Sequence, residues 1–358
     1  MRYLKVIIIS TATAIGTAYA VAVDVPVEQL TVNLGFLLQA GHEYEYYNLH
    51  DKHLDKSKFV LPEAELRVYG RFFDKVDYDL RLSRSYMPRE AYVGTALARG
   101  LSTKVGRFFL PFGVEATTYE GYLVCTSNTV TSTRIAPGRN YGVRFDYLLE
   151  RDRWPYKIGA AAGVFNNSSK WTTSPLVDGV GRIYGAPVPG FKTLNFGLSY
   201  YYGKEYRWKY RGRYEPEEYH FLAEPRVGAD LSLTTWRFEF LAEYMQRFIN
   251  DYPIRAHEYR EPYFVYKDTY ERGYFGTLTY TQPLPWRYFQ DFAPYARYER
   301  WKPAILERGD IAEDRYTAGL ALHFLGRNLM FRGDYTRILE DEYRTSNDVI
   351  ASEFQVMF

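Results

Sequence analysis

The sequence predicts an all-β protein that crosses a membrane as an antiparallel β-barrel of about sixteen strands. Three observations carry this prediction. Apolar and polar residues alternate with period two over much of the chain, which is the pattern of half-buried strands. Aromatic residues make up 18% of the sequence, including 36 tyrosines, although 25% of residues are charged. Beyond the N-terminal segment there is no run of about 18 apolar residues, so a spanning chain must form a closed barrel.

The alternation is clearest in segments that contain no glycine-rich turn. Residues 76–83 read VDYDLRLS, residues 226–233 read RVGADLSL and residues 353–358 read EFQVMF. In each segment the apolar side chains fall on one face of an extended strand, and the charged and small ones fall on the other. A soluble β-sandwich would show the same period. The N-terminal segment, the aromatic strand ends, the terminal Phe358 and the pattern of connections favour the barrel.

Short and long connections alternate along the chain. Tight turns are expected at 73–75, 98–100, 234–235 and 326–328, and long polar loops at 44–58, 166–178, 203–224 and 250–269. This asymmetry is typical of outer-membrane barrels, which have short periplasmic turns and longer extracellular loops. A barrel of about sixteen strands encloses water rather than packed side chains.

Residues 1–20 have the features of a secretory signal peptide. A short basic region with Arg2 and Lys5 precedes an apolar stretch, and Ala18-Tyr19-Ala20 matches a small-residue cleavage site. A membrane anchor or a buried helix is the alternative. Residues 21–358 are then expected to form a single outer-membrane barrel domain. Removing Arg2 and Lys5 lowers the formal charge from +2 to zero, so no nucleic-acid partner is expected.

The segment 91–143 carries a family resemblance. It contains Gly106-Arg107-Phe108, then Pro111-Phe112-Gly113, and after a Ser/Thr-rich stretch Pro137-Gly138-Arg139-Asn140-Tyr141. These motifs resemble those of the phosphate-selective porin O and P family of Gram-negative outer membranes. The resemblance implies a sixteen-stranded, usually trimeric pore in which residues 110–138 form the third extracellular loop. That loop would fold inward from the turn Pro111, Phe112 and Gly113 and narrow the lumen.

The resemblance also implies a function and a set of partners. The expected function is a water-filled channel for passive diffusion of small hydrophilic solutes, with a lean towards anions such as phosphate. The expected partners are outer-membrane lipid and lipopolysaccharide, further copies of the chain in a homotrimer, and the barrel assembly machinery. The terminal Phe358 resembles the signal that this machinery recognises.

Charged residues on the polar faces are the candidate chemistry of a channel, because rings of fixed charge set ion selectivity. The alternation places ten basic residues inward: Arg67, Arg71, Arg81, Lys104, Arg144, Lys157, Arg226, Arg237, Arg297 and Arg332. It also places ten acidic residues inward: Glu65, Asp77, Asp79, Asp146, Asp230, Glu239, Glu243, Glu299, Asp334 and Glu353. One interpretation is a wall of opposite charges paired across neighbouring strands. The other is a track of basic residues for anions.

The candidate anion-binding residues are those closest in sequence to the inward loop. They are Arg81, Lys104 and Arg144 on strands, and Arg134 and Arg139 on the loop. Glu115 and Glu120 balance the two loop arginines. Anchoring of Arg134 and Arg139 to wall carboxylates is the interpretation that the sequence favours for this pair.

Other reactive side chains have weaker signals. Cys125 has no neighbouring cation in sequence, so a packing role is favoured over a reactive thiol. Residue types that can bind a metal occur together at His42, His50, Asp51 and His53, but their spacing fits no established metal-binding signature. We find no catalytic motif and expect no catalytic residue, metal or cofactor. A closed structural or adhesive barrel, and a barrel enzyme with a Ser–His pair assembled in space, remain the alternative functions.

Processing of the N-terminus gives the first testable prediction. If residues 1–20 are removed after Ala20, the mature protein begins at Val21. N-terminal sequencing of protein extracted from outer membranes measures this directly. A mature protein that begins at Met1 would show that residues 1–20 are retained.

Overall fold

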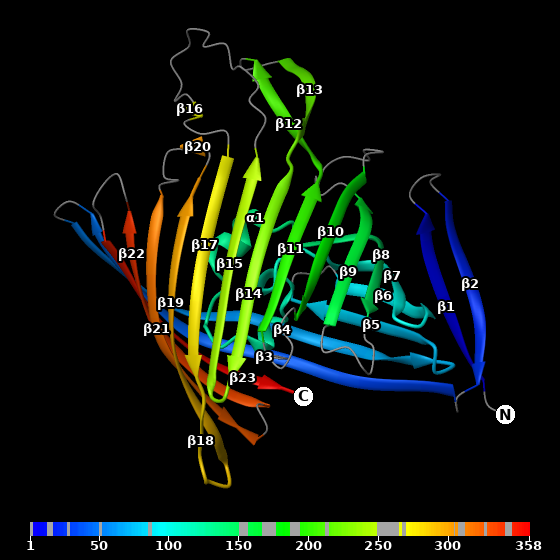
Figure 1. Ribbon diagram of the computed structural model, residues 1–358, viewed down its shortest axis with the longest axis horizontal. Coiled ribbons are helices and arrows are strands. Elements are labelled where there is room, and N and C mark those ends of the chain that lie inside the picture. Colours follow the sequence, from blue (N-terminus) through cyan, green and yellow to red (C-terminus); the bar gives the residue numbers. More distant parts are fainter. Residues whose placement is uncertain are drawn as a thin grey trace.

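The computed structural model describes residues 3–12, 17–26, 29–49, 52–84, 88–149, 157–166, 177–186, 194–211, 215–248, 265–266, 270–303, 305–306, 312–325, 328–340 and 346–358. Within these ranges, sixteen antiparallel strands form one closed barrel (Figure 1). The fold therefore confirms the predicted barrel.

The barrel strands follow one another in chain order. They are β3 (Leu30–Leu49), β4 (Lys52–Phe72), β5 (Val76–Ser83), β6 (Pro88–Ala98), β7 (Leu101–Phe109), β8 (Arg139–Leu149), β9 (Lys157–Asn166), β10 (Val177–Ala186), β11 (Leu194–Tyr202), β14 (Arg226–Thr235), β15 (Phe238–Phe248), β17 (Tyr270–Tyr280), β19 (Phe289–Lys302), β21 (Glu313–Phe324), β22 (Leu329–Glu340) and β23 (Ser346–Met357). The two-residue β18 (Gln282–Pro283) continues β17 along β19. Among the described residues, no helix is long and apolar enough to cross a bilayer.

The last strand closes the barrel against the first. β23 pairs with β3 in an antiparallel register that runs from Asn347↔Tyr47 to Met357↔Leu37. The C-terminal residue extends this seam. The Phe358 N–H donates to the Phe36 carbonyl at 3.0 Å, and the Phe36 N–H donates to the Phe358 carbonyl at 2.9 Å. The two rings also pack, with centroids 5.1 Å apart.

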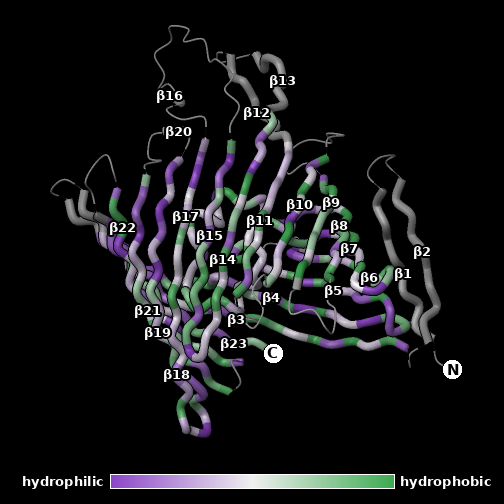
Figure 2. The backbone as a smooth tube through the Cα atoms, in the orientation of Figure 1, coloured by the Kyte–Doolittle hydropathy of each residue, from purple (hydrophilic) through white to green (hydrophobic). Residues whose placement is uncertain are grey.

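Hydrophobic and hydrophilic residues alternate along the barrel strands (Figure 2), and their side chains lie on opposite faces of the barrel, as the sequence predicts. Leu34 and Leu198 face outward and are 72% and 57% exposed. On the last strand Phe354 faces outward, whereas Glu353 and Gln355 face inward and are buried. An apolar outer surface and a polar interior suit a barrel that faces lipid outside and water inside.

Aromatic side chains gather near the ends of the strands. At the end that carries the short connections and Phe358, here called the turn end, the packed ring pairs are Phe72–Tyr78, Phe238–Tyr280 and Phe289–Phe324. Towards the opposite end, here called the loop end, Tyr298 packs between Tyr274 and Tyr316. Two such belts are expected at the two membrane–water interfaces.

The prediction of a long loop over 44–58 was wrong. β3 and β4 continue through this region as a paired hairpin, with Tyr44 opposite Ser57 in the register. Its polar side chains pair across the strands, since Tyr44 Oη donates to Asp55 at 2.7 Å and Lys58 Nζ lies 2.8 Å from Glu43. Cross-strand pairs of this kind stabilise a strand pair that has no apolar face. Polarity alone therefore does not identify a loop here.

Two other connections differ from the sequence prediction in detail. The connection at 203–224 contains a separate hairpin of β12 (Lys204–Arg211) and β13 (Glu215–Ala223). The tight turn predicted at 234–235 lies at Trp236 and Arg237, because β14 continues to Thr235 and Trp236 has a positive φ of 49°. Most of the predicted loops at 166–178 and 250–269 lies outside the described residues, although β16 (Val265–Tyr266) pairs with β20 (Ile305–Leu306).

The N-terminal residues are not part of the barrel sheet. β1 (Tyr3–Ala12) pairs only with β2 (Thr17–Pro26) among the described strands, and the predicted cleavage site lies within β2. The barrel starts at Leu30, so removal of residues 1–20 would leave the closed sheet intact. Processing itself stays a prediction.

The closing seam gives the second testable prediction. Deleting Phe358 removes two backbone hydrogen bonds, about 1–3 kcal/mol together, and an aromatic contact with Phe36. We expect a lower yield of the folded, heat-modifiable form on unheated gels. Phe145→Ala is the matched control, because Phe145 is an outward-facing aromatic residue that is 47% exposed and lies on β8, which is paired with β7 and β9 and not with the seam strands. An unchanged folded yield after the deletion would contradict the proposed role of Phe358.

Candidate pore and its inward loop

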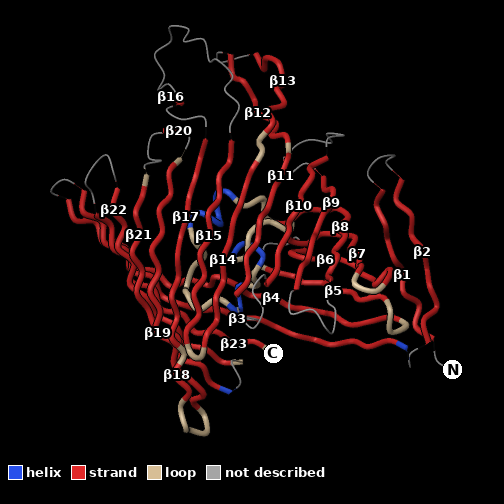
Figure 3. Tube along the Cα trace, in the orientation of Figure 1, coloured by secondary structure: helices blue, strands red, loops and turns tan. Residues whose placement is uncertain are grey.

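The third connection at the loop end, residues 110–138, folds into the barrel. It follows the connections β3–β4 and β5–β6 at the same end and joins β7 to β8. Figure 3 shows its short helical turns within the ring of strands, including α1 (Val130–Ile135). The neck of the loop is closed by a hydrogen bond from the Leu110 N–H to the Gly138 carbonyl at 3.0 Å. We call residues 110–138 the inward loop.

The backbone of the turn that starts the inward loop lies very close to the barrel wall. Gly113 has a positive φ of 73°, and a β-carbon at this position would collide with the Glu243 carboxylate. Next to it, Phe112 is fully buried in an apolar cluster that also contains Ile135 and Met245. Because an apolar side chain gains free energy when it leaves water, this cluster holds both ends of the loop against the wall.

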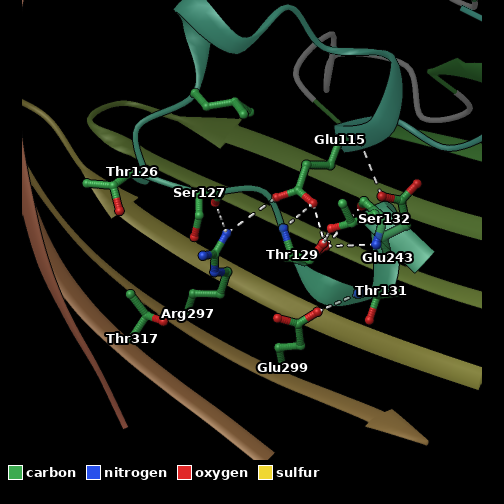
Figure 4. Close-up of polar contacts among 12 residues, drawn as sticks. Glu115, Thr126, Ser127, Thr129, Thr131, Ser132, Glu243, Arg297, Glu299 and Thr317 are labelled. Carbon is green, nitrogen blue, oxygen red and sulfur yellow. Dashed lines mark hydrogen bonds and ion pairs between the residues drawn. The ribbon is translucent and has the colours of Figure 1, made fainter. Parts of the chain in front are cut away.

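Carboxylates on the wall hold the backbone of the inward loop (Figure 4). Glu243 on β15 accepts hydrogen bonds from the Val114 N–H at 2.7 Å and from the Glu115 N–H at 3.4 Å. Glu299 on β19 accepts from the Thr131 N–H at 2.7 Å. On β22, Asp334 accepts from both the N–H and the hydroxyl of Thr126, at 3.1 and 2.8 Å. Hydrogen bonds to a charged acceptor are the stronger kind.

Glu115 links the two halves of the loop. Its Oε2 accepts from the N–H and the hydroxyl of Thr129, at 3.0 and 2.5 Å. Its Oε1 lies 3.4 Å from Nη1 of Arg297, and the same Arg297 atom donates to the Ser127 carbonyl at 3.0 Å. Glu115 is therefore a buried structural anchor and does not line the passage. The side chain of Glu120 lies outside the described residues.

Further polar side chains tie the loop to the rest of the wall. Arg332 donates to the Leu123 carbonyl at 2.5 Å and Gln355 donates to the Gly121 carbonyl at 2.9 Å. On the other side, the hydroxyl of Tyr119 donates to Glu65 on β4 at 2.8 Å. Because its anchors lie on strands from β4 to β23, the loop extends across the lumen.

Most inward arginines for which the structure gives a contact are paired with carboxylates. Examples are Arg67–Asp79 at 2.6 Å, Arg144–Asp146 at 2.5 Å, Arg182–Asp230 at 2.6 Å and Arg332–Glu353 at 2.5 Å. These contacts fit the interpretation of a wall of paired charges. A close pair of opposite charges contributes little net field in the lumen, so the paired residues contribute weakly to selectivity.

The five candidate anion-binding residues fall into two groups. Arg81 lies 3.3 Å from Asp79 and 3.6 Å from Glu90, and Arg144 pairs with Asp146. Arg139 lies 3.2 Å from Glu90 and thus anchors the exit of the loop, as the sequence favoured. These three guanidinium groups have carboxylate partners. Their charges are largely compensated.

Lys104 and Arg134 form the second group. The Lys104 ammonium lies 4.8 Å from the centre of the Tyr92 ring, and its cross-strand neighbour is Arg144. Arg134 is exposed on α1, and its guanidinium lies 5.6 Å from the centre of the Trp301 ring. Within the described part of the chain, neither cation has a carboxylate partner. Each is held beside an aromatic ring, which is a favourable position for a cation.

The other singled-out residues play no visible chemical role. Cys125 is buried in the inward loop, and this burial raises the pKa of its thiol to about 11, which makes it a poor nucleophile at neutral pH. Its packing role is therefore the better interpretation. His42 shares a hydrogen bond of 2.8 Å with Ser57, whereas His50, Asp51 and the side chain of His53 lie outside the described residues. No cluster of potential metal ligands occurs among the residues that are described.

Sequence reasoning missed the main role of Glu243, Glu299 and Asp334. The period-two pattern correctly places them on the inner face, but it does not reveal that they accept hydrogen bonds from a loop more than a hundred residues away. The presence of inward acids on β15, β19 and β22, together with a loop rich in Ser and Thr, is the only sequence signal we can identify.

Comparisons with known proteins support the fold. No protein-family model and no curated protein matches the chain. Among solved structures, an anion-selective porin from Comamonas acidovorans is 10% identical, with a TM-score of 0.59, and the match covers 92% of this chain and 100% of that one. OprB from Pseudomonas putida is 13% identical, with a TM-score of 0.56 over 93% and 95% of the two chains.

A third similar structure is the outer-membrane channel DcaP of Acinetobacter baumannii, which is 12% identical with a TM-score of 0.56 over 93% and 99% of the chains. At these identities the likeness concerns the fold alone. The chain thus has the sixteen-stranded fold of Gram-negative outer-membrane barrels. Membership of the phosphate-selective porin O and P family is not confirmed.

The inward loop gives the third testable prediction. Deleting residues 117–133 removes its anchors to β4, β19, β22 and β23 and opens the lumen, so single-channel conductance in a planar bilayer should rise. The matched control is deletion of residues 205–222, which belong to the hairpin β12–β13 outside the barrel sheet. Equal conductance of the wild type and the folded 117–133 deletion would show that the inward loop does not narrow the passage.

Proposed function

We propose that this chain is a porin, which forms a water-filled channel in the outer membrane for passive diffusion of small hydrophilic solutes and mildly prefers anions. The observation that carries this proposal is the unequal use of charge around the inward loop. The acids near the loop are occupied by hydrogen bonds or arginines, whereas Lys104 and Arg134 have no carboxylate partner among the described residues.

The acids are occupied in two ways. Glu243, Glu299 and Asp334 point at backbone N–H groups of the inward loop, whose positive ends offset the carboxylate charge. All three carboxylates are buried, so water and passing ions do not reach them freely. The wall acids away from the loop, such as Asp79 and Asp146, are paired with arginines.

The two uncompensated cations favour anions only where the passage is narrow. Fixed charges in a water-filled pore are screened beyond about 8 Å at physiological salt. Arg134 lies on the inward loop itself, and Lys104 lies on β7, the strand from which the loop departs. We propose that both act near the narrowest part, and the expected selectivity is mild.

Phosphate is the finer part of the proposal. The guanidinium group of Arg134 presents a planar fork of donors that suits phosphate oxygens. The similar structure from Comamonas acidovorans is described as an anion-selective porin, which agrees with a preference for anions but says nothing of phosphate. We also propose, from the family resemblance, that the barrel assembles as a homotrimer in contact with lipid and lipopolysaccharide.

Two other functions would give different observations. A structural or adhesive barrel with a closed lumen would show no steady conductance in a planar bilayer. A barrel enzyme would need a nucleophile and a base within hydrogen-bond reach, and none of the described contacts forms a Ser–His–carboxylate triad.

The fourth testable prediction concerns ion selectivity. In a gradient of potassium chloride, the wild-type channel should show a zero-current potential of the sign expected for anion preference. The double variant Lys104→Gln and Arg134→Gln removes both uncompensated cations, so the potential should move towards the cation side. Adding phosphate should lower the chloride current of the wild type more than that of the variant.

A variant that removes a whole pair is the matched control. Arg144→Gln combined with Asp146→Asn takes away an arginine and its carboxylate partner together, so the net charge of the wall is unchanged. Its zero-current potential should stay close to that of the wild type. A clear cation preference of the wild type would contradict the proposal. If both double variants shift the potential equally, Lys104 and Arg134 are not its cause.

A further inference from the structure

A basic cavity lies in the wall of the barrel at the loop end, separate from the two uncompensated cations of the passage. Its volume is about 400 Å³, and it is lined by Pro62, Glu63, Ser83, Arg84, Arg89, Arg107 and Arg139. Four of these residues are arginines and one is acidic. The lining comes from β4, β7 and β8 and from the ends of β5 and β6.

The cavity sits at a step in the wall. β5 ends at Ser83, which is opposite Glu65 in the register, and β6 begins at Pro88. β4 continues past this point, since its residues 52–60 pair with β3 and not with β5. The ends of the short strands β5 and β6 thus leave a recess beside the taller β4 and beside β7 and β8. Side chains from several strands converge there.

The charges of the cavity are only partly compensated. Arg89 forms an ion pair with Glu63, and Arg139 lies 3.2 Å from Glu90. Arg84 and Arg107 have no carboxylate partner within the described ranges. Four guanidinium groups against two carboxylates leave two positive charges at the recess. This excess is unusual in a wall where most inward arginines are paired.

Two buried polar atoms at the cavity have no hydrogen-bond partner among the described residues. One is Nε of Arg107, a donor, and the other is Oε1 of Glu63, an acceptor. A buried guanidinium N–H without an acceptor is costly, so an acceptor supplied by a ligand would be favourable there. The Arg107 guanidinium also lies 5.6 Å from the Tyr141 ring, which limits its orientations.

We propose that this cavity binds a phosphate monoester group. A phosphate monoester carries a charge of about −1.5 to −2 at neutral pH, which matches the two uncompensated arginines. Its oxygens accept paired hydrogen bonds from the planar guanidinium fork. The volume lies in the range of sites for small organic ligands, so the group that bears the phosphate also has room.

The phosphate monoester can belong to a soluble molecule or to a membrane lipid. The cavity lies at the loop end, where solutes enter the barrel and where lipid headgroups surround it. Binding here does not require conduction, so the inference stands apart from the proposed channel function. Failure of the selectivity test would therefore bear on Lys104 and Arg134, whereas failure of the binding test would bear on Arg84 and Arg107.

The experiment measures binding of both kinds of phosphate monoester to the folded barrel. Equilibrium dialysis with glycerol 3-phosphate tests the soluble source, using protein in an uncharged detergent. Retention of phosphatidic acid over phosphatidylcholine, measured after reconstitution into nanodiscs of both lipids, tests the lipid source. The variant Arg84→Gln with Arg107→Gln should weaken the binding that the wild type shows by about tenfold or more, because charge-assisted hydrogen bonds are lost.

Two further variants complete the test. Arg71→Gln is the matched control, since Arg71 pairs with Asp77 near the turn end and should leave binding unchanged. Glu63→Gln removes the negative charge of the lining and should tighten binding, which keeps the proposal testable if the double variant does not fold. Binding of either probe with these responses supports the cavity and identifies the source. Absence of binding of both probes to the wild type, or equal binding by wild type, double variant and Glu63→Gln, would overturn the proposal.

Discussion

Satisfaction of the backbone hydrogen bonds is the constraint on which this structure depends. Lipid offers no partner for a peptide N–H or carbonyl, so a sheet in a membrane must have no free edge. The chain meets this requirement through one seam, in which β23 pairs with β3 over eleven residues from 347 to 357. Phe358 adds one more pair of hydrogen bonds to Phe36. Among the described barrel strands, every other pairing joins strands that are neighbours in barrel order along the chain, so the seam is the step that converts a meander into a barrel.

Closure creates an interior in which polar groups must find partners of their own. The inward loop and the wall supply them to each other. The loop contributes backbone N–H groups and carbonyls that are not hydrogen-bonded within a helix or strand. The wall contributes the carboxylates and arginines that bind these groups. One consequence is that the acidic and basic residues of the wall are not equally available to ions in the passage.

The sequence was a good guide to whatever depends on local pattern. Alternation placed Leu198 and Phe354 outside and Gln355 inside, and the Pro111-Phe112-Gly113 turn marked the start of the inward loop. It failed where cross-strand partners override composition. Tyr44, Asp55 and Lys58 were predicted to lie in a loop because this stretch is polar. In the structure Tyr44 pairs with Asp55, and Lys58 pairs with Glu43, across β3 and β4. The sequence also could not predict which charges pair with one another. Arg182 pairs with Asp230 because the register of three strands, β10, β11 and β14, brings the two side chains together.

The anchors of the inward loop also bear on the order in which the molecule is assembled. Leu123 is held by Arg332, which lies 209 residues later in the chain, and Gly121 is held by Gln355, which lies 234 residues later. Contacts between residues so distant in sequence form slowly, because a long chain must be brought together before they stabilise anything. While the chain emerges from its N-terminus, residues 110–138 exist without most of their final partners. The anchors at Leu123 and Gly121 therefore form only once β22 and β23 are in place, and a chain truncated before β22 would lack both of them.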